Sequence, residues 1–520
     1  MAIVELVPDP SPGPSGGPST GGGRRRYRLS NPATGAPLRE FDAATAEDVA
    51  AAITRARAAQ PAWAALPVAQ RAAFMQEALR LLLERQEAII DLLVSETGRS
   101  RFETLMMEIF PACDALNYWS RNAARQLKDE RVGLHLLRHK SARIHYRPMG
   151  VVGVITPWNG PFILSLNPTV QALLAGNAVI VKPSEVTPFS AKMVETLLRD
   201  AGVPEGVVQV IPGDGATGAA LCEGGVNRVS FTGSVATGRR VGEACGRNLI
   251  PCTLELGGKD PMIVCADADL ERAAGGALFG GIMNNGQFCS STERIYVVES
   301  VADAFTEKLV AKTRALKLAK EGEYDVGPFI FPRQLEVVDR HVREAVAAGA
   351  RVHCGGERRP DVGPLYYAPT VIDRVTGDMA LMHEETFGPI LPIVRVKDEA
   401  EAIREANTTA FGLGATVWTR DKARGIEIAR QLRAGAVVVN DSSITYGILD
   451  VPFGGVGESG VGSVNGRNGI RNYCHAQPII VDRFGLAAEE VWYPYTLKKH
   501  EGLQGALRWL WGSVLRVLLA

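Results

Sequence analysis

The feature of this sequence that most constrains its fold is a series of short apolar runs between residues 150 and 258. The runs are GVVGVIT (150–156), NAVIVKP (177–183), GVVQVIP (206–212), NRVSFTG (227–233) and CTLELGG (252–258), and segments with helical patterning separate them. Continuous Val and Ile runs that alternate with helices are typical of parallel strands whose two faces are covered by crossover helices. The sequence therefore predicts an α/β protein with a parallel sheet, and ligands of such sheets bind at the carboxyl ends of the strands.

The length and composition limit the other possibilities. A chain of 520 residues is long enough for two or three units, each with a core of its own. Its 57 basic residues equal its 57 acidic residues, so no overall field attracts nucleic acid or acidic lipid. The eight cysteines have irregular spacings that match neither a disulfide framework nor a set of metal ligands. We therefore expect a cytoplasmic protein with no metal site and no nucleic-acid partner.

The segments before the predicted sheet have a different character. Residues 1–28 contain a run of Pro, Gly and Ser without the apolar core of a signal peptide, so we expect a flexible leader. Residues 45–66 and 68–98 have apolar residues at helical spacing, and the second segment ends at Gly98, a favourable helix C-cap. Residues 135–150 alternate in polarity like a strand or a hairpin.

A glycine-rich stretch, GDGATG at residues 213–218, has the G-x-G-x-x-G spacing of a dinucleotide-binding loop. It follows the third predicted strand, and the next strand does not end in an acid that could bind a ribose. Two interpretations stay open: the stretch binds a pyrophosphate, or it is a plain glycine-rich turn.

Two other strand ends carry side chains that are better suited to a nucleotide. Lys182 and Glu185 follow one strand, and a cation beside an acid can bind ribose hydroxyls. Gly233 and Ser234 follow another strand, where a helix amino terminus offers free N–H groups and a positive dipole to a phosphate. Each pair taken alone is also typical of an ordinary solvated loop.

Seven motifs occur along the chain in a defined order: TPWNGP, VKPSE, FTGS, LELGGK, GQFC, EETFGP and PFGGVGESGVG. With these motifs, residues 30–484 resemble the NAD(P)-dependent aldehyde dehydrogenase superfamily. The resemblance implies a Rossmann-type parallel-sheet cofactor domain, a second α/β catalytic domain and a small β oligomerisation arm, and a C-terminal amphipathic tail follows beyond the general family pattern. These parts are expected at residues 29–128 with 149–257, at 258–457, at 129–148 with 475–484, and at 485–520.

The resemblance also implies three catalytic residues. Cys289 matches the family's nucleophile, whose thiolate attacks the aldehyde carbon and, after hydride loss to the nicotinamide, becomes a thioester. Glu255 matches the base that activates water to hydrolyse this thioester. Asn159 matches a donor of the oxyanion hole, together with the backbone N–H of Cys289. Free cysteines are more often buried and inert, and we expect this of the other seven.

The cofactor implied by the resemblance is NAD, with NADP as the alternative. The expected contacts are Thr156, Pro157, Trp158, Lys182, Glu185, Gly215, Phe231, Gly233, Ser234, Thr237, Leu256, Glu385 and Phe387. Glu385 and Phe387 match residues that position the nicotinamide ribose and ring, although Phe387 also fits an ordinary core position. The carboxylate of Glu185 is expected to repel a 2′-phosphate and so to favour NAD.

Two departures from the family pattern concern the substrate. Gly160 stands where an aromatic residue commonly follows the oxyanion asparagine, which leaves one wall of the aldehyde pocket undefined. Val456, Gly457 and Glu458 stand where many relatives carry a lysine, and this resembles the branch of fatty and aromatic aldehyde dehydrogenases. Residues 503–520, rich in Leu and Trp, predict a helix that covers the substrate entrance, lies on a membrane surface or packs on a subunit.

The leading hypothesis is NAD(P)-dependent oxidation of an aldehyde, of medium or long aliphatic chain, to a carboxylate. Two alternatives stay open. One is an acylating relative that passes the thioester to coenzyme A, although such enzymes commonly lack the base that Glu255 matches. The other is a non-enzymatic protein with the same fold. The expected partners are a small-molecule aldehyde and further copies of the chain, in a homodimer or homotetramer, because family members pair subunits through the arm strands.

Overall fold

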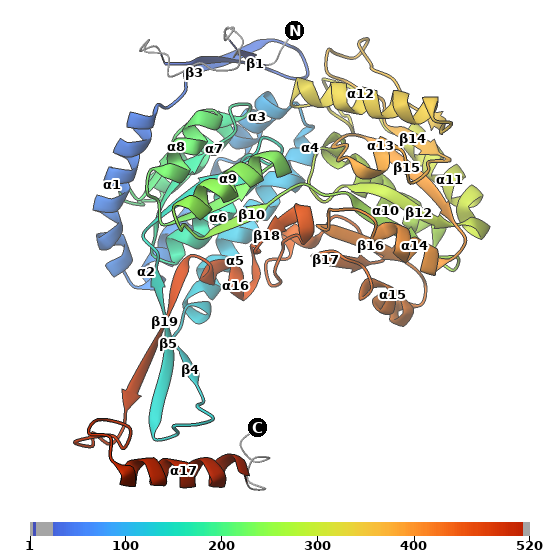
Figure 1. Cartoon of the computed structure of the whole chain (residues 1–520). Helices are drawn as coiled ribbons and strands as arrows, with labels where there is room; N and C mark the ends of the chain where they lie inside the picture. The colour runs from blue at the N-terminus through green and yellow to red at the C-terminus, as the bar shows by residue number, and fades with distance from the viewer. Residues whose placement is uncertain (1–3, 7–23, 513–520) are drawn as a thin grey trace, which may run out of the picture.

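The computed structural model describes residues 4–6 and 24–512. Two α/β lobes lie side by side, and a long antiparallel arm extends away from them with a helix at its far end (Figure 1). The α/β architecture with parallel sheets that the sequence predicts is confirmed.

The first lobe contains a six-stranded sheet with the order β18-β10-β9-β6-β7-β8. Its strands are β6 (Val151–Ile155), β7 (Ala178–Lys182), β8 (Val208–Val210), β9 (Arg228–Thr232), β10 (Cys252–Glu255) and β18 (Gly460–Val461). The five strands predicted from the apolar runs are all present and parallel, and β18 is antiparallel at the edge. Strands β6 and β7 are buried along their whole length, as helices on both faces of the sheet require.

The order of the strands determines where a ligand can bind. Strand β6 pairs with β7 on one side and with β9 on the other, so the crossovers proceed in opposite directions from β6. In such a sheet a crevice opens at the carboxyl ends of the strands where the order reverses. Strand β8, which precedes the GDGATG stretch, is the outermost strand and lies away from that reversal.

Helices cover both faces of this sheet (Figure 1). They are α1 (Ala46–Ala65), α2 (Val68–Glu84), α3 (Gln86–Thr97), α6 (Ile163–Leu174), α7 (Pro188–Asp200), α8 (Gly215–Glu223) and α9 (Val235–Arg247). The segment expected to form one long helix over residues 68–98 is divided at Arg85, and both resulting helices, α2 and α3, contact α7. Helix α3 ends at Gly98, which has a φ of 68° as a left-handed C-cap, in agreement with the sequence.

Three further helical segments follow α3 along the chain: α4 (Arg101–Thr104), a π-helical turn (Leu105–Ile109) and α5 (Phe110–Gln126).

The second lobe contains a seven-stranded sheet with the order β13-β14-β15-β12-β11-β16-β17. Its strands are β11 (Asp260–Val264), β12 (Thr292–Val298), β13 (Arg351–Cys354), β14 (Thr370–Asp373), β15 (Ile390–Val396), β16 (Gly414–Trp418) and β17 (Ala436–Val439). Its helices are α10 (Leu270–Ile282), α11 (Glu299–Arg314), α12 (Pro332–Ala347), α13 (Ala380–His383), α14 (Glu399–Ala406) and α15 (Lys422–Ala429). Strand β13 alone is antiparallel to its neighbour in this sheet.

The arm is a three-stranded antiparallel sheet that leaves the first lobe near α16 (Gly466–Arg471). It consists of β4 (Glu130–Val132), β5 (Lys140–Pro148) and β19 (Cys474–Asp482), with β5 in the centre. These are the strands expected at residues 129–148 and 475–484, and their role in subunit pairing stays a prediction.

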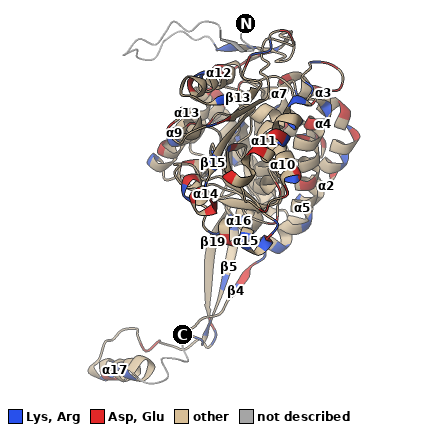
Figure 2. Ribbon diagram, turned by 90° about the vertical axis from the view of Figure 1, so that its right-hand side faces the viewer, with Lys and Arg blue, Asp and Glu red and all other residues tan. Residues whose placement is uncertain are grey.

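The tail continues beyond the far end of the arm. Helix α17 (Leu497–Gly512) lies there, distant from both lobes (Figures 1 and 2). The helix expected over residues 503–520 therefore begins earlier, at Leu497, and residues 513–520 lie outside the described residues. No helix within the described part of the chain combines the length and the apolar character needed to cross a bilayer.

The flexible leader predicted for residues 1–28 is too long. A small sheet is formed by β1 (Val4–Leu6), β2 (Arg26–Ser30) and β3 (Pro37–Asp42). Tyr27 and Leu29 of β2 are buried, and the Tyr27 hydroxyl donates a hydrogen bond of 2.9 Å to Asp214. These contacts fix β2 on the first lobe. Residues 7–23, which hold the Pro, Gly and Ser run, lie outside the described residues.

Candidate active site

Cys289 lies in the loop between α10 and β12, at the junction of the two lobes. Helix α10 ends at Ile282, and a short 3-10 turn, Met283–Gly286, follows it. Asn284 and Asn285 in this turn have φ values of 54° and 56°, in the left-handed region that asparagine enters more readily than most residues. The turn directs the chain so that Cys289 borders two different cavities.

Asn159 is tied to the cysteine loop by two hydrogen bonds. Its side-chain Nδ2 donates to the carbonyl of Gln287 at 3.0 Å, and its own carbonyl accepts from Asn284 Nδ2 at 3.0 Å. An asparagine amide has two N–H donors, so one donor of Asn159 remains for another acceptor. Asn159 and Cys289 both border the same two cavities, and the structure therefore brings these two predicted residues together.

Arg99 and Glu108 support the Asn159 loop through hydrogen bonds, and none of the sequence motifs includes them. The Arg99 guanidinium donates to the Asn159 carbonyl at 3.2 Å and to Glu108 Oε1 at 2.8 Å. Glu108 Oε2 accepts from the Ile163 backbone N–H at 2.8 Å, so the pair supports both ends of the turn before α6. Both side chains are buried. The signal in the sequence was weak: an arginine after the C-cap Gly98 and a glutamate within an apolar helical segment.

Two glycines allow the strand end of β10 to approach the cysteine loop closely. A Cβ atom at Gly258 would lie 2.4 Å from the Cys289 carbonyl oxygen, and one at Gly257 would lie 2.5 Å from the Glu385 carboxylate. The Gly258 N–H donates to Glu385 Oε1 at 3.0 Å. Any larger residue at these positions would separate the parts of the site, which explains the glycine pair of the LELGGK motif.

Glu255 is the last residue of β10 and borders one cavity with Cys289. Its side chain is buried, and neither carboxylate oxygen has a hydrogen-bond partner among the described residues. Burial without such partners raises the pKa of Glu255 well above its ordinary value, because the charged form is poorly solvated. A carboxyl group with a raised pKa can accept a proton from water more readily than an ordinary glutamate.

The first of the two cavities, which we call the apolar cavity, has a volume of about 450 Å³ and is bordered by Asn159, Glu255 and Cys289. Most of its wall consists of apolar side chains from the π-helical turn, α5, α6, α10, the cysteine loop and the loops near β17 and β18. These are Met106, Met107, Phe110, Ile163, Leu164, Phe279, Met283, Phe288, Ile444, Ile448, Phe453 and Val464. Gly160 also borders the apolar cavity. Because glycine has no side chain, this position does not narrow the cavity as an aromatic residue would.

The second cavity, which we call the strand-end cavity, has a volume of about 430 Å³ and lies at the carboxyl ends of β6, β7 and β9. Twelve of the thirteen predicted cofactor contacts line it. They are Thr156, Pro157, Trp158, Lys182, Glu185, Phe231, Gly233, Ser234, Thr237, Leu256, Glu385 and Phe387. Gly215 is not among its lining residues; it begins α8, which Asp214 caps with its side chain. The GDGATG stretch therefore acts as a helix-capping turn at the edge of the sheet.

The two ends of the strand-end cavity differ in chemistry. At one end Lys182 Nζ lies 3.8 Å from Glu185 Oε2, and burial lowers the pKa of Lys182. Ser234 caps the amino terminus of α9 beside them. At the end near Cys289, the rings of Trp158 and Phe387 meet edge to face at 5.5 Å. Burial, together with the charge of Glu293, raises the pKa of Glu385 to about 8.

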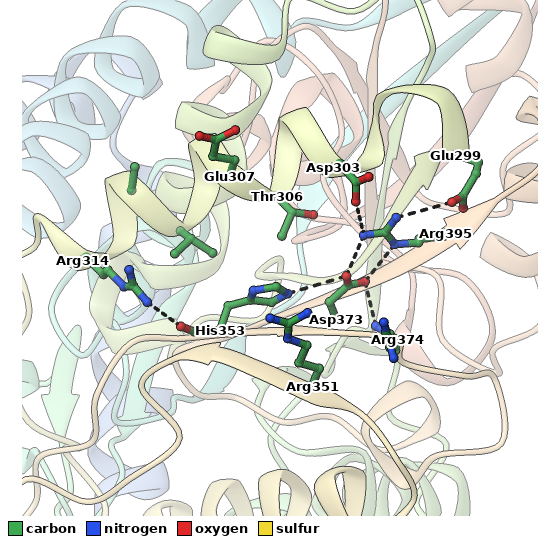
Figure 3. Close-up of a pocket in the computed structure, with 12 residues that line it drawn as sticks. Glu299, Asp303, Thr306, Glu307, Arg314, Arg351, His353, Asp373, Arg374 and Arg395 are labelled. Carbon is green, nitrogen blue, oxygen red and sulfur yellow. Dashed lines mark hydrogen bonds and ion pairs between the residues drawn. The ribbon is translucent and has the colours of Figure 1, made fainter.

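A larger cavity, of about 800 Å³, lies on the second lobe and has no part in this arrangement. Its wall consists largely of charged side chains from α11, β13, β14 and β15 (Figure 3). Arg395 there pairs with Asp373 at 2.9 Å and with Asp303 at 2.7 Å. It contains no cysteine and none of the predicted catalytic residues, so the site around Cys289 is the better candidate.

The resting state of Cys289 leads to a testable prediction. Burial, followed by the nearby carboxyl groups of Asp260, Glu255 and Glu385, raises the pKa of the Cys289 thiol to about 12. Below its pKa a thiol is protonated, and its reactive thiolate fraction grows tenfold with each pH unit. We therefore expect alkylation of Cys289 by iodoacetamide in the free protein to accelerate roughly tenfold per unit between about pH 7 and pH 9. Peptide mass spectrometry would measure it, and a plateau within that range would contradict the prediction.

Comparisons with known proteins agree with this geometry. The sequence pattern of the aldehyde dehydrogenase family matches residues 19–479. A protein of Mycolicibacterium smegmatis named putative succinate-semialdehyde dehydrogenase [NADP(+)] is 43% identical, over 86% of this chain and 87% of that protein. A 4,4'-diapolycopene aldehyde oxidase of Methylomonas sp is 37% identical, over 93% of this chain and 91% of that protein. The crystal structure of a Mycobacterium tuberculosis aldehyde dehydrogenase complexed with NAD+ superposes with a TM-score of 0.84 at 34% identity, covering 89% of this chain and 96% of that chain. On the strength of this agreement in sequence and fold, the chain belongs to the aldehyde dehydrogenase family.

Proposed function

We propose that this protein is an NAD(P)-dependent aldehyde dehydrogenase that oxidises apolar aldehydes to carboxylates. The observation that carries the proposal is the position of Cys289 between two cavities. One cavity has apolar walls and contains a buried glutamate, and the other has the polar groups that a dinucleotide requires. Only a reaction between two ligands that meet at the sulfur makes use of both.

The residues of the strand-end cavity fit a dinucleotide cofactor. Lys182 and Glu185 would hold ribose hydroxyls, and the first turn of α9, capped by Ser234, would hold the pyrophosphate. Glu385 and Phe387 lie at the Cys289 end, where they would orient the second ribose and the ring. When bound, the nicotinamide supplies the hydride acceptor. The carboxylate of Glu185 disfavours a 2′-phosphate and so favours NAD, although several relatives are named for NADP(+).

The chemistry of the chain's own residues follows in two stages. The Cys289 thiolate attacks the aldehyde carbon, and the free N–H of Asn159 with the backbone N–H of Cys289 stabilises the resulting oxyanion. Loss of hydride from this adduct leaves a thioester on Cys289. Glu255 then accepts a proton from the water that attacks the thioester carbon, and the carboxylate product leaves as the thiolate is released.

The walls of the apolar cavity support a class of substrate. The ionisable side chains that border it are Asp114, Glu255, Cys289 and Tyr446, and no lysine or arginine of the described residues lines it. A substrate carboxylate buried there would lack a counter-ion, which is costly, and Asp114 would repel it. Several relatives carry the name succinate-semialdehyde dehydrogenase, but this cavity favours an aldehyde with an apolar chain.

A series of aldehydes tests this assignment. We expect kcat/KM to rise from butanal to decanal by up to about fourfold per methylene, the factor that corresponds to roughly 0.8 kcal/mol for each buried CH₂. Succinate semialdehyde should react at least about 100-fold more slowly than decanal, because its carboxylate finds no cation. Initial rates of NADH and NADPH formation would measure both effects. A preference for succinate semialdehyde over every alkanal would contradict the apolar assignment without affecting the family assignment.

We further propose that the chain forms a homodimer or homotetramer through the arm. Strand β19 pairs with β5 on one side only, and no strand of the described residues pairs with its other edge, near which Ile479, Ile480 and Val481 are exposed. Edges of this kind pair with another chain unless they are protected. Of the three roles predicted for the tail, a lid over the substrate entrance of the same subunit has the least support, because α17 lies at the far end of the arm, away from both lobes (Figure 1).

A further inference from the structure

The far end of the arm concentrates positive charge in a chain that is neutral overall. Residues 131–143 contain three arginines and one lysine but no aspartate or glutamate. Arg131, Arg138 and Arg143 line a cavity of about 470 Å³ together with Arg483, which connects β19 to the tail. None of these four guanidinium groups has a hydrogen bond or an ion pair with another described residue. Their charge is therefore available to an external anion.

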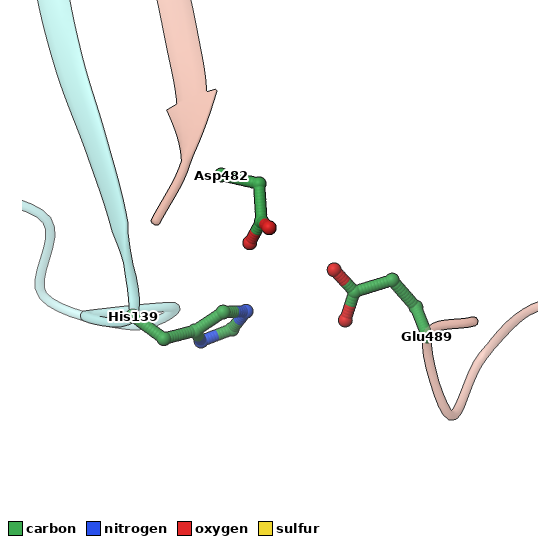
Figure 4. A group of neighbouring side chains, drawn as sticks. All are labelled: His139, Asp482 and Glu489. Carbon is green, nitrogen blue, oxygen red and sulfur yellow. The ribbon is translucent and has the colours of Figure 1, made fainter. Parts of the chain in front are cut away.

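Two acidic groups near this cavity pair with Lys140 rather than with any of the four arginines. Lys140 Nζ lies 2.6 Å from Glu489 Oε1 and 3.3 Å from Asp482 Oδ1. His139 lies beside the same two carboxylates (Figure 4). This ion pairing joins the end of β19, the start of β5 and the first part of the tail. It holds the tail next to the arginine cavity.

Apolar side chains surround the positive charge at this end of the molecule. The loop between β4 and β5 exposes Leu136 at 36% and Leu137 at 53%, and Leu137 has a φ of 54°, a strained value for a leucine. In the tail, α17 buries no side chain and exposes Leu503 at 55%, Leu507 at 47% and Trp511 at 48%. Exposed apolar side chains that gather in one region mark a surface that contacts another protein or a membrane.

We propose that the arm end and the tail together form a docking surface for an anionic phospholipid bilayer. The four arginines bind headgroup phosphates, while Leu136, Leu137 and the apolar side of α17 enter the outer part of the acyl layer. Three observations favour this occupant over another protein: an arginine cavity without internal acids, an amphipathic helix beside it, and exposed aromatic residues. Trp492, Tyr493 and Tyr495 are the aromatic residues of the tail linker, and such side chains favour the bilayer interface.

If the proposed function is taken as the basis, a bilayer-binding surface at the end of the arm would bring the enzyme close to its substrate. Long-chain aldehydes dissolve in bilayers, so a subunit anchored by its arm would work close to its substrate store. The arm end lies opposite the lobes (Figure 2), and binding there leaves both cavities at Cys289 open.

Vesicle sedimentation with the full-length protein tests the proposal. We expect binding to vesicles of phosphatidylcholine with about 30 mol % phosphatidylglycerol, and at least about tenfold weaker binding to phosphatidylcholine alone. Replacing all four arginines of the cavity with glutamine should weaken binding to the anionic vesicles at least about 50-fold, because each cation near such a surface contributes roughly fivefold. Raising the salt from about 50 mM to about 300 mM should weaken wild-type binding as well.

A control variant separates site-specific binding from a general effect of charge. It changes to glutamine four exposed arginines of the lobes that lack ion pairs: Arg121, Arg240, Arg351 and Arg420. This variant should bind anionic vesicles like the wild type. A third variant, with Leu503, Leu507 and Trp511 changed to serine, should also lose vesicle binding, and no buried residue of α17 is affected.

Two results would overturn the proposal. One is equal binding of the two arginine variants to anionic vesicles. The other is a fall in particle mass, seen by light scattering, when the cavity arginines or the α17 residues are replaced, since this would assign the surface to a second copy of the chain. Oxidation of hexanal in solution should stay within about twofold of the wild type in all variants. If the wild-type protein did not oxidise hexanal at all, that result would instead count against the proposed function.

Discussion

Replacement of Cys289 with alanine is expected to abolish aldehyde oxidation, with a fall in kcat of at least about four orders of magnitude. Hydride can leave only from a tetrahedral adduct, and the adduct needs a sulfur atom at the junction of the apolar and strand-end cavities. Cys289 borders both cavities, and no other cysteine of the described residues borders either of them. Formation of NADH from decanal would measure the loss.

The same variant should keep its fold and its affinity for the cofactor. Cys289 is one of many residues that line the strand-end cavity, so its loss should change cofactor binding little. An alanine also fits the loop, which the hydrogen bond between Asn284 and Asn159 holds in place. Cys354→Ala, on the distant strand β13, is the matched control and should retain nearly full activity. Thermal unfolding and calorimetric titration with NAD would check both variants. Activity above a few per cent in Cys289→Ala would refute the covalent mechanism.

Glu255→Gln should separate hydride transfer from hydrolysis. The adduct forms and loses hydride before any water attacks, so one equivalent of NADH should appear rapidly. Turnover should then fall by about 10²- to 10⁴-fold, the usual contribution of a general base. Intact-protein mass spectrometry of the variant should show an increase equal to the acyl group on Cys289.

Coenzyme A distinguishes the alternative reaction in the same experiment. If the wild-type protein forms acyl-coenzyme A in preference to the carboxylate, the acylating assignment replaces the hydrolytic one. If Glu255→Gln turns over at the wild-type rate, another group is the base. The raised pKa of Glu255 adds a pH test, because its basic form grows as pH rises. Where hydrolysis limits the rate, wild-type kcat should increase with pH, and the glutamine variant should lose that increase.

The sequence predicted those parts of the site that depend on local pattern. The five apolar runs became parallel strands because continuous burial on two faces admits few other structures. Since parallel strands end at one edge of a sheet, the loops after β6, β7 and β9 had to converge, and twelve of the expected cofactor contacts line one cavity. The family motifs also identified Cys289 and Asn159, and two hydrogen bonds of 3.0 Å join the Asn159 backbone and side chain to the cysteine loop.

Features that depend on distant contacts could not be predicted. Arg99 supports Asn159, which lies 60 residues further along the chain, and it is itself paired with Glu108. No local sequence pattern links these three residues. The G-x-G-x-x-G spacing could not show that Gly215 lies outside the lining of the strand-end cavity, because the position of β8 at the sheet edge depends on strand order rather than on the stretch itself. The leader was assigned too many residues because β2 is stabilised by contacts with Asp214, far along the chain.

The meeting of two cavities at one sulfur atom has a consequence for how such a protein can change. Each ligand has its own cavity, so a longer or bulkier aldehyde does not have to pass the dinucleotide when it enters or leaves. Substitutions at Ile163 or Phe453 can reshape the apolar cavity. They do not affect Lys182 or Glu185, which border only the strand-end cavity. Substrate range and cofactor choice can therefore change through separate substitutions. The residues around Cys289, which border both cavities, are the ones that such substitutions must leave intact.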